Sequence, residues 1–368
     1  MKSFATFLFI LILIPCFNLF AFAEDIYENA AEKFGVDRLD DILTEEEKSI
    51  SGDFDFNGKY DVSGSLARLW EKFIGAVLQE IKANYKFAFT LVFIALLCAL
   101  SAALCRKKEI SEFIEISACG AAALLLLGGI DSMVRETLDA MYRLSDYSKA
   151  ALPVVFTAAA AGGALSSSAS KFAAVTFALD VLMSLSQRII IPAINAFLSL
   201  SIAQAMFPNA VLALVQKLCK WTCGTLMSAM TIAFTAYINM IGAIGSAVDA
   251  SAVKTARSFI SGALPVVGGM ISDASAMILS AAGVIKNCAG VYGLIAVAVM
   301  CAGPFAILST KMLIFKAVSA AAESMQSVRL TSLYSGMSNA MGLLLGLLGS
   351  CGIMLFISLT AAMKAVTF

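Results

Sequence analysis

The stretch FAFTLVFIALLCALSAAL, residues 87–104, contains 18 consecutive residues without a charged side chain. At about 1.5 Å per residue, a helix of this length covers roughly 27 Å, close to the ~30 Å hydrocarbon thickness of a bilayer. The basic cluster Arg106-Lys107-Lys108 follows directly, and Lys and Arg accumulate on the cytoplasmic side of membrane spans. The stretch therefore predicts a transmembrane helix whose N-terminal end lies outside the cytoplasm.

The whole chain of 368 residues has the composition of a membrane protein. Hydrophobic residues make up 60% of it and charged residues 14%, and the mean hydropathy is +0.87. Soluble domains carry about 25% charged residues, because their surface faces water. We therefore expect an all-α fold, a polytopic transmembrane helical bundle in the cell membrane, in direct contact with the lipid bilayer.

The N-terminal residues 1–23 resemble a secretory signal peptide. Lys2 precedes an apolar run that ends in Ala21-Phe22-Ala23, and this small-residue pattern predicts cleavage between Ala23 and Glu24. An uncleaved first span is the alternative, because the region is very apolar. Export of the residues after Ala23 agrees with the orientation that the basic cluster predicts.

Residues 24–86 are expected to form an exported arm. Residues 24–61 hold thirteen acidic and four basic side chains. From Leu66 to Tyr85, apolar residues recur at helical spacing, while Lys72 and Glu80 belong to the polar face. This pattern predicts an amphipathic helix that lies on the membrane surface or against a partner, and the sequence favours neither.

The rest of the chain contains an apparent internal repeat. The string ALPVV at 151–155 recurs at 263–267, and Pro192 and Pro304 are separated by the same 112 residues. We interpret residues 87–130 as two lead-in transmembrane helices, 131–242 as the first repeat and 243–368 as the second. The alternative is coincidence, since low-complexity composition inflates such matches.

A repeat has consequences for topology and for transport. Two equal units after two lead-in spans give an even total, between six and ten and preferably eight, with both ends of the mature chain outside. Paired Pro/Gly-interrupted helices in corresponding halves often mark a substrate path in transporters. Here these segments contain Pro153 in the first copy and Pro265, Gly268 and Gly269 in the second.

The sequence argues against catalysis and against a cofactor. It has no histidine, which removes the commonest metal ligand and general base, and it has no G-x-x-x-x-G-K-[ST] nucleotide motif. Residues 87–368 carry 17 basic and 11 acidic residues. This balance is ordinary for membrane loops and gives no case for nucleic-acid binding. We expect no enzymatic activity, no cofactor and no metal.

A few residues remain as candidates for function or packing. Asp180 lies within an apolar run and is as consistent with a buried functional acid as with a structural one. Asp273 and Lys286 flank an Ala/Ser/Ile-rich stretch, where the plainer interpretation is that they mark the ends of a span. In the last span Gly342, Gly346 and Gly349 allow close helix packing, within one chain or between copies, and we favour the former.

The string KTARSFISGALPVVGGMISDA at 254–274, with KNCAG at 286–290, resembles the stage III sporulation protein AE family of endospore-forming bacteria. The order of segments also fits, and the resemblance runs from about Leu66 to the end, while residues 24–61 look generic. Five residues carry the match most specifically: Lys254, Pro265, Gly268, Ser272 and Asp273. The family has no established catalytic residues to transfer.

This resemblance implies a subunit of a secretion-like channel complex between mother cell and forespore. It implies a place in the mother-cell membrane around the forespore, with other membrane and ring-forming subunits and a separate ATPase as partners. The alternative function is a self-sufficient secondary transporter with a midplane site near Pro153, Pro265 and Asp180. The two are compatible, because the subunit could be the permease of its complex.

Overall fold

The computed structural model describes residues 42–51, 62–105, 107–161, 165–263 and 268–363, and only the backbone of residues 242–288. The predicted signal peptide, its predicted cleavage site and most of the acidic part of the predicted arm lie outside these residues. The described elements are α4 (Glu45–Ser51), α5 (Val62–Leu104), α6 (Lys108–Ala161), α7 (Leu165–Leu185), the π-helical turn η2 (Ser186–Ile190), α8 (Ile191–Met206), α9 (Ala210–Ala263), α10 (Gly268–Ser324) and α11 (Val328–Met363). The described part contains helices and no strand, which confirms the all-α prediction.

Six helical segments of the described part are long and apolar enough to cross a membrane. They are Gly64–Leu104, Glu109–Ala160, Lys171–Met206, Ala210–Ile241, Ala289–Ser324 and Val328–Met363. Six falls within the expected six to ten, but below the preferred eight. An even number of crossings places both ends of the bundle on one side of the membrane; which side that is remains a prediction.

The difference from eight arises mainly in α6. The sequence suggested a span that ends near Ile130, then a charged amphipathic segment and a new interruption at Pro153. The structure joins all three in one helix of 54 residues, without a break at the predicted start of the first repeat. Such a helix is about 80 Å long, so it extends well beyond ~30 Å of hydrocarbon.

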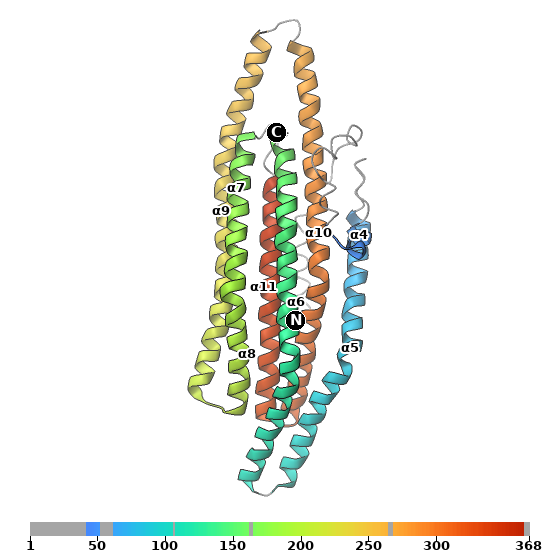
Figure 1. The fold of residues 1–368 in the computed structure, drawn as a ribbon, viewed down its shortest axis with the longest axis vertical. Helices are drawn as coiled ribbons and strands as arrows, with labels where there is room; N and C mark the ends of the chain where they lie inside the picture. Colours follow the sequence, from blue (N-terminus) through green and yellow to red (C-terminus); the bar gives the residue numbers. More distant parts are fainter. Residues whose placement is uncertain (1–41, 52–61, 106, 162–164, 264–267, 364–368) are drawn as a thin grey trace.

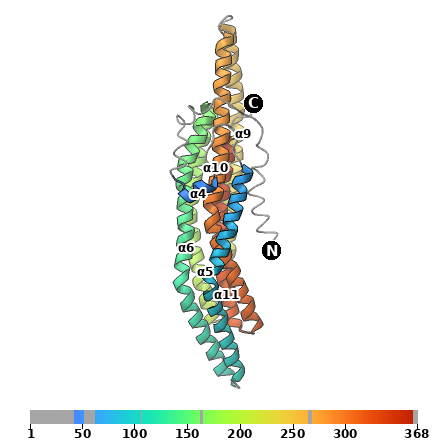
Figure 2. The same ribbon diagram turned by 90° about the vertical axis from the view of Figure 1, so that its right-hand side faces the viewer.

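The long helices run along one elongated bundle and alternate in direction, except that α8 continues α7 through η2 (Figure 1). At one end α9 and α10 extend past the other helices, and at the opposite end the turn between α5 and α6 projects furthest (Figure 2). The most apolar windows of α10 and α11 are each 61% buried, against 17% for α5. The C-terminal helix pair therefore forms the centre, and α5, α6 and α9 are left with large outward faces.

The centre can be this tight because α11 has small residues where other helices approach. A Cβ atom added at Gly342 would lie 3.5 Å from Met312, and one at Gly349 would lie 3.3 Å from Phe305, both on α10. Gly346 instead faces Met227 of α9, at 3.8 Å. Of these four α11 glycines, Gly336 has the closest neighbour, since an added Cβ would lie 2.7 Å from the Cβ of Ser201 on α8.

The prolines act differently from the predicted interruptions. Pro153 and Pro304 lie inside α6 and α10, which continue through them. Pro192 follows the π-helical turn η2. Because proline has no N–H, Pro192 cannot donate a hydrogen bond to the carbonyl of Arg188, and this accounts for the local widening of the helix. Pro265 lies outside the described residues, between the end of α9 and the start of α10. The 112-residue repeat therefore remains a prediction.

The turn from α10 to α11 shows why the chain reverses there without a glycine. The N–H of Ser327 donates to the carbonyl of Ala322, and that of Gln326 donates to Glu323. This is the Schellman arrangement, in which the residue after the helix adopts a left-handed conformation. Gln326 does so, with φ of 59°, in a position that favours glycine.

Candidate functional site

Charged side chains connect the N-terminal helices to α10 in an otherwise apolar setting. Lys311 is the only charged residue between Asn287 and Phe315, and its side chain is 11% exposed. Its Nζ lies 3.8 Å from Oε1 of Glu80 on α5 and 3.6 Å from Oε2 of Glu136 on α6. Asn84 donates a 2.7 Å hydrogen bond to the same Glu80 oxygen. We call Lys311, Glu80, Glu136 and Asn84 the Lys311 cluster.

The Lys311 cluster brings one cation together with two carboxylates. Ionisable groups are costly away from water unless they are paired, so the lysine ties α5, α6 and α10 to one relative position. Within the described residues, Oε2 of Glu136 is buried and has no hydrogen-bond partner. The cluster is therefore sensitive to loss of its one cation.

A second set of polar contacts lies near the turns at the ends of α8 and α10. Nε of Arg329, on α11, lies 3.6 Å from Oε2 of Glu115 on α6. The same guanidinium donates through Nη1 to the carbonyl of Met206, at the C-terminus of α8. A cation at the C-terminus of a helix is favourable, because the last carbonyls of the helix have no partner within it.

The carboxylate of Glu47 links helix α4 to α6, beside the apolar contact that the buried Leu43 makes with the core. The N–H of Thr44 donates to Oε2 of Glu47 at 2.9 Å, and the N–H of Glu47 donates to Oγ1 of Thr44 at 3.4 Å. These reciprocal bonds form a capping box, which the T-x-x-E spacing favours. Oε2 of Glu47 also accepts a 2.5 Å hydrogen bond from Nη2 of Arg143 on α6.

The environment of Glu47 favours its ionised form. Burial alone would raise the pKa of this carboxyl, but the hydrogen bonds from Arg143 and Thr44 outweigh burial and hold the pKa below its ordinary value. Because the pKa is lower in the folded state, docking of α4 is complete above the unfolded pKa. Docking is lost as the pH falls through the folded-state pKa.

We therefore expect acid to release α4 before the rest of the bundle unfolds, and Arg143→Gln to move this release to higher pH. Amide hydrogen exchange across Glu45–Ser51, corrected for its intrinsic pH dependence, measures the effect. Lys149→Gln is the control, because Lys149 forms an exposed pair with Asp146 on the same helix. Release at the same pH in both variants would show that Arg143 does not hold the arm.

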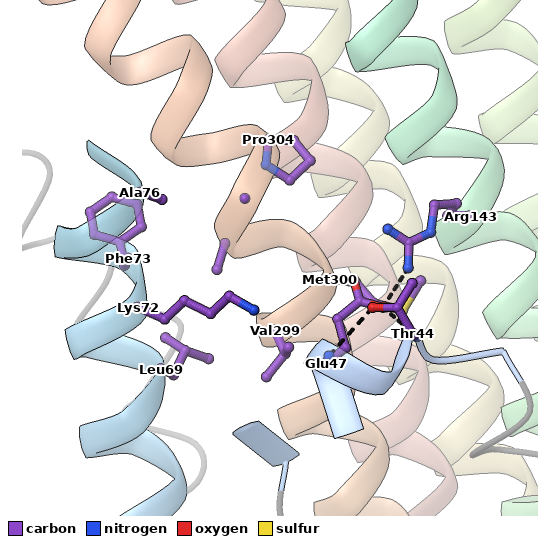
Figure 3. A pocket seen from close by; sticks show the side chains of 12 residues that line it. Thr44, Glu47, Leu69, Lys72, Phe73, Ala76, Arg143, Val299, Met300 and Pro304 are labelled. Atoms are coloured by element: carbon purple, nitrogen blue, oxygen red, sulfur yellow. Dashed lines mark hydrogen bonds and ion pairs between the residues drawn. The ribbon is translucent and has the colours of Figure 1, made fainter. Parts of the chain in front are cut away.

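A cavity of about 290 Å³ lies beside this contact, between α4, α5, α6 and α10 (Figure 3). Lys72 of α5 points into it from the wall opposite Arg143 (Figure 3). Twelve residues line the cavity: Thr44, Glu47, Leu69, Lys72, Phe73, Ala76, Arg143, Val299, Met300, Ala302, Gly303 and Pro304. It combines apolar walls with two cations and one carboxylate.

The residues that the sequence singled out are not gathered at this site. Asp180 is exposed on α7, and Pro153 is half-buried within α6. Gly268, Gly269, Asp273 and Lys286 belong to α10, in the part of which only the backbone is described. Among the described residues, no group of three or more His, Cys, Asp or Glu side chains is placed to hold a metal ion.

Lys311 was not among the residues predicted from the sequence, although the sequence contains a signal for it. A single lysine in a long apolar run is the pattern of a functional or paired charge at membrane depth, and Lys311 fits it. Glu80 and Lys72 were assigned to the polar face of an amphipathic helix, and the structure shows that both are partly buried and lie towards α10. The apolar stripe of Trp70, Ile74 and Leu78 is exposed instead.

Comparison with known proteins identifies the family. The family described as stage III sporulation protein AE matches residues 54–366. The chain belongs to this family. One relative is the stage III sporulation protein AE of Bacillus subtilis (strain 168), which is 23% identical over 358 residues, covering 93% of this chain and 89% of that protein. No solved structure matches.

The range matched by the stage III sporulation protein AE family contains the whole Lys311 cluster and most of the cavity. Helix α4, with Glu47, precedes it. The resemblance seen in the sequence is confirmed, and the six apolar helices identify a multi-pass membrane protein of a sporulation family.

Proposed function

We propose that the chain is a non-enzymatic membrane subunit of a secretion-like channel complex between mother cell and forespore, required for sporulation. The observation that carries the proposal is the family match, which covers all six apolar helices. In this proposal the protein lies in the mother-cell membrane around the forespore, with its mature N-terminus outside the cytoplasm. Its partners are other membrane and ring-forming subunits and a separate ATPase.

The shape of the bundle supports a role in assembly. Helices α9 and α10 extend past their neighbours at one end (Figure 2), and α5 exposes an apolar stripe that includes Trp70, Leu78 and Tyr85. Exposed apolar surface of this kind is typical of sites that contact lipid or another protein. Because the sequence lacks a P-loop motif, energy for transport would come from a partner or an ion gradient.

Two measurements test the proposal together. Deletion of the gene should leave vegetative growth normal and stop development of the engulfed forespore. The tagged chain, extracted from sporulating cells in mild detergent, should co-purify with the ATPase and with ring-forming subunits. Normal spore formation in the deletion strain, or recovery of the chain from sporulating cells without any of these partners, would contradict it.

The transporter interpretation gains no specific support from the described residues. Asp180, its candidate midplane acid, is exposed on α7, and the cavity beside α4 is lined by residues of other helices. The transporter interpretation can be tested directly with liposomes that contain this protein alone. It predicts ion-dependent solute uptake, and it predicts that Asp180→Asn abolishes this uptake.

A further inference from the structure

We propose that the cavity between α4, α5, α6 and α10 binds a small amphiphilic carboxylate, and that Glu47 of the chain's own arm occupies the carboxylate position in the arm-docked state. This inference does not depend on the proposed function. It concerns a ligand of the bundle itself rather than its assembly with other subunits.

The first argument is the geometry of the carboxylate already in place. Oε2 of Glu47 accepts hydrogen bonds from Nη2 of Arg143 and from the backbone of Thr44, and the Glu47 side chain is only 11% exposed. Arginine is the side chain best suited to recognise a carboxylate, since its donors form a rigid planar fork. The wall of the cavity therefore contains a working carboxylate-binding group.

The second argument is the space that remains. With the Glu47 side chain in place, the cavity still measures about 290 Å³, near the lower end of the range for small-molecule pockets. Among its lining residues are two cations, Arg143 and Lys72, and one carboxylate. Once Glu47 is displaced, Arg143 is left to bind one anionic group, and the volume suits a small molecule rather than a folded segment of a partner.

The third argument is the character of the remaining wall. Leu69 is 2% exposed and packs with Val299, and Phe73, Met300 and Pro304 complete an apolar surface on α5 and α10 (Figure 3). Small-molecule sites typically combine such a surface with a few placed polar groups. The fitting ligand has an apolar body against this wall and one carboxylate towards Arg143.

Competition follows from this arrangement. A ligand whose carboxylate takes the place of Glu47 must displace that side chain, and α4 is a short helix of seven residues held in part by this contact. Binding and docking of α4 therefore oppose each other, and the coupling acts in both directions. Removal of the Glu47 charge should increase affinity for the ligand.

The test uses the full chain in lipid nanodiscs, titrated with octanoate by calorimetry after subtraction of empty nanodiscs. We expect saturable binding, at least tenfold tighter in Glu47→Gln, at least tenfold weaker in Arg143→Gln and unchanged in Lys149→Gln. Octanoate should also reduce amide protection across α4, which partition into lipid would not do.

Three results would overturn the inference. Equal binding of octanoate and octylamine would show that the carboxylate is not recognised, and inorganic phosphate binding as tightly as octanoate would show that the apolar wall contributes nothing. Unchanged or weaker binding in Glu47→Gln would exclude competition with the arm. The last comparison decides the question even where Arg143→Gln does not yield folded protein, as judged by its elution volume.

Discussion

Lys311→Met is expected to destabilise the folded protein by about 3 kcal/mol, since breaking a buried ion pair from one side typically costs 3–5 kcal/mol. The substitution keeps most of the side-chain volume but removes the one cation that faces Glu80 and Glu136. Glu136 is 40% exposed, so water screens part of the penalty and the lower end of the range applies. The change in stability is measured by heating the purified protein and recording the temperature at which its monodisperse elution peak is lost.

A charge-free variant separates electrostatics from packing. In Lys311→Met combined with Glu80→Gln and Glu136→Gln no charge remains unpaired, so most of the lost stability should return, as buried ion pairs can often be replaced by neutral groups. Lys316→Met is the matched control, because Lys316 lies on the same helix and is exposed. If the triple variant is as unstable as the single one, the cluster does not act through its charge.

Gly336→Ala is expected to cost about 2 kcal/mol, within the 1–3 kcal/mol typical of overpacking, and Gly336→Val more. The added Cβ would lie 2.7 Å from the Cβ and 2.9 Å from the Oγ of Ser201. Ser201 cannot simply rotate away, because its backbone-attached Cβ is the nearest atom. Its hydroxyl is also engaged, donating to Phe197 and accepting from Gln216 of α9. Thermal unfolding measures the loss.

Ser201→Gly tests the mechanism of that loss. In the double variant Gly336→Ala, Ser201→Gly the space is restored, so the two substitutions should offset each other relative to their separate effects. Gly346→Ala is the control, since its Cβ would meet only Met227, at an ordinary 3.8 Å. Additive losses in the double variant would show that α8 and α11 do not approach at this point.

The sequence predicted a helical membrane protein correctly, although not the preferred number of spans, because the bilayer imposes a local rule. A run such as residues 87–104 must satisfy its own backbone in lipid, and no distant residue is needed to recognise it. The capping box of Thr44 and Glu47 was not predicted, although its partners are only three residues apart. Family membership followed from a contiguous string at 254–274.

Features that depend on tertiary contacts could not be predicted in this way. Arg143 is 96 residues from its partner Glu47, and Lys311 is far in sequence from both its acids. The charged segment 131–149 is amphipathic in sequence, but the sequence does not show that Lys311 of α10 supplies a partner for Glu136. Nor does a glycine pattern show which neighbour it meets, and Gly336, which lies against Ser201, is outside the stripe that the sequence suggested.

Six membrane crossings with both ends outside the cytoplasm form the central claim, and cysteine labelling on intact protoplasts tests it most directly. In a chain with Cys105 and the other native cysteines changed to serine, a single cysteine replaces Lys364, Asn209 or Gln326 in turn. An impermeant maleimide should label position 364 from outside, while positions 209 and 326, in the turns after α8 and α10, should react only after lysis. Labelling of either turn from outside, or of position 364 only after lysis, would contradict the account.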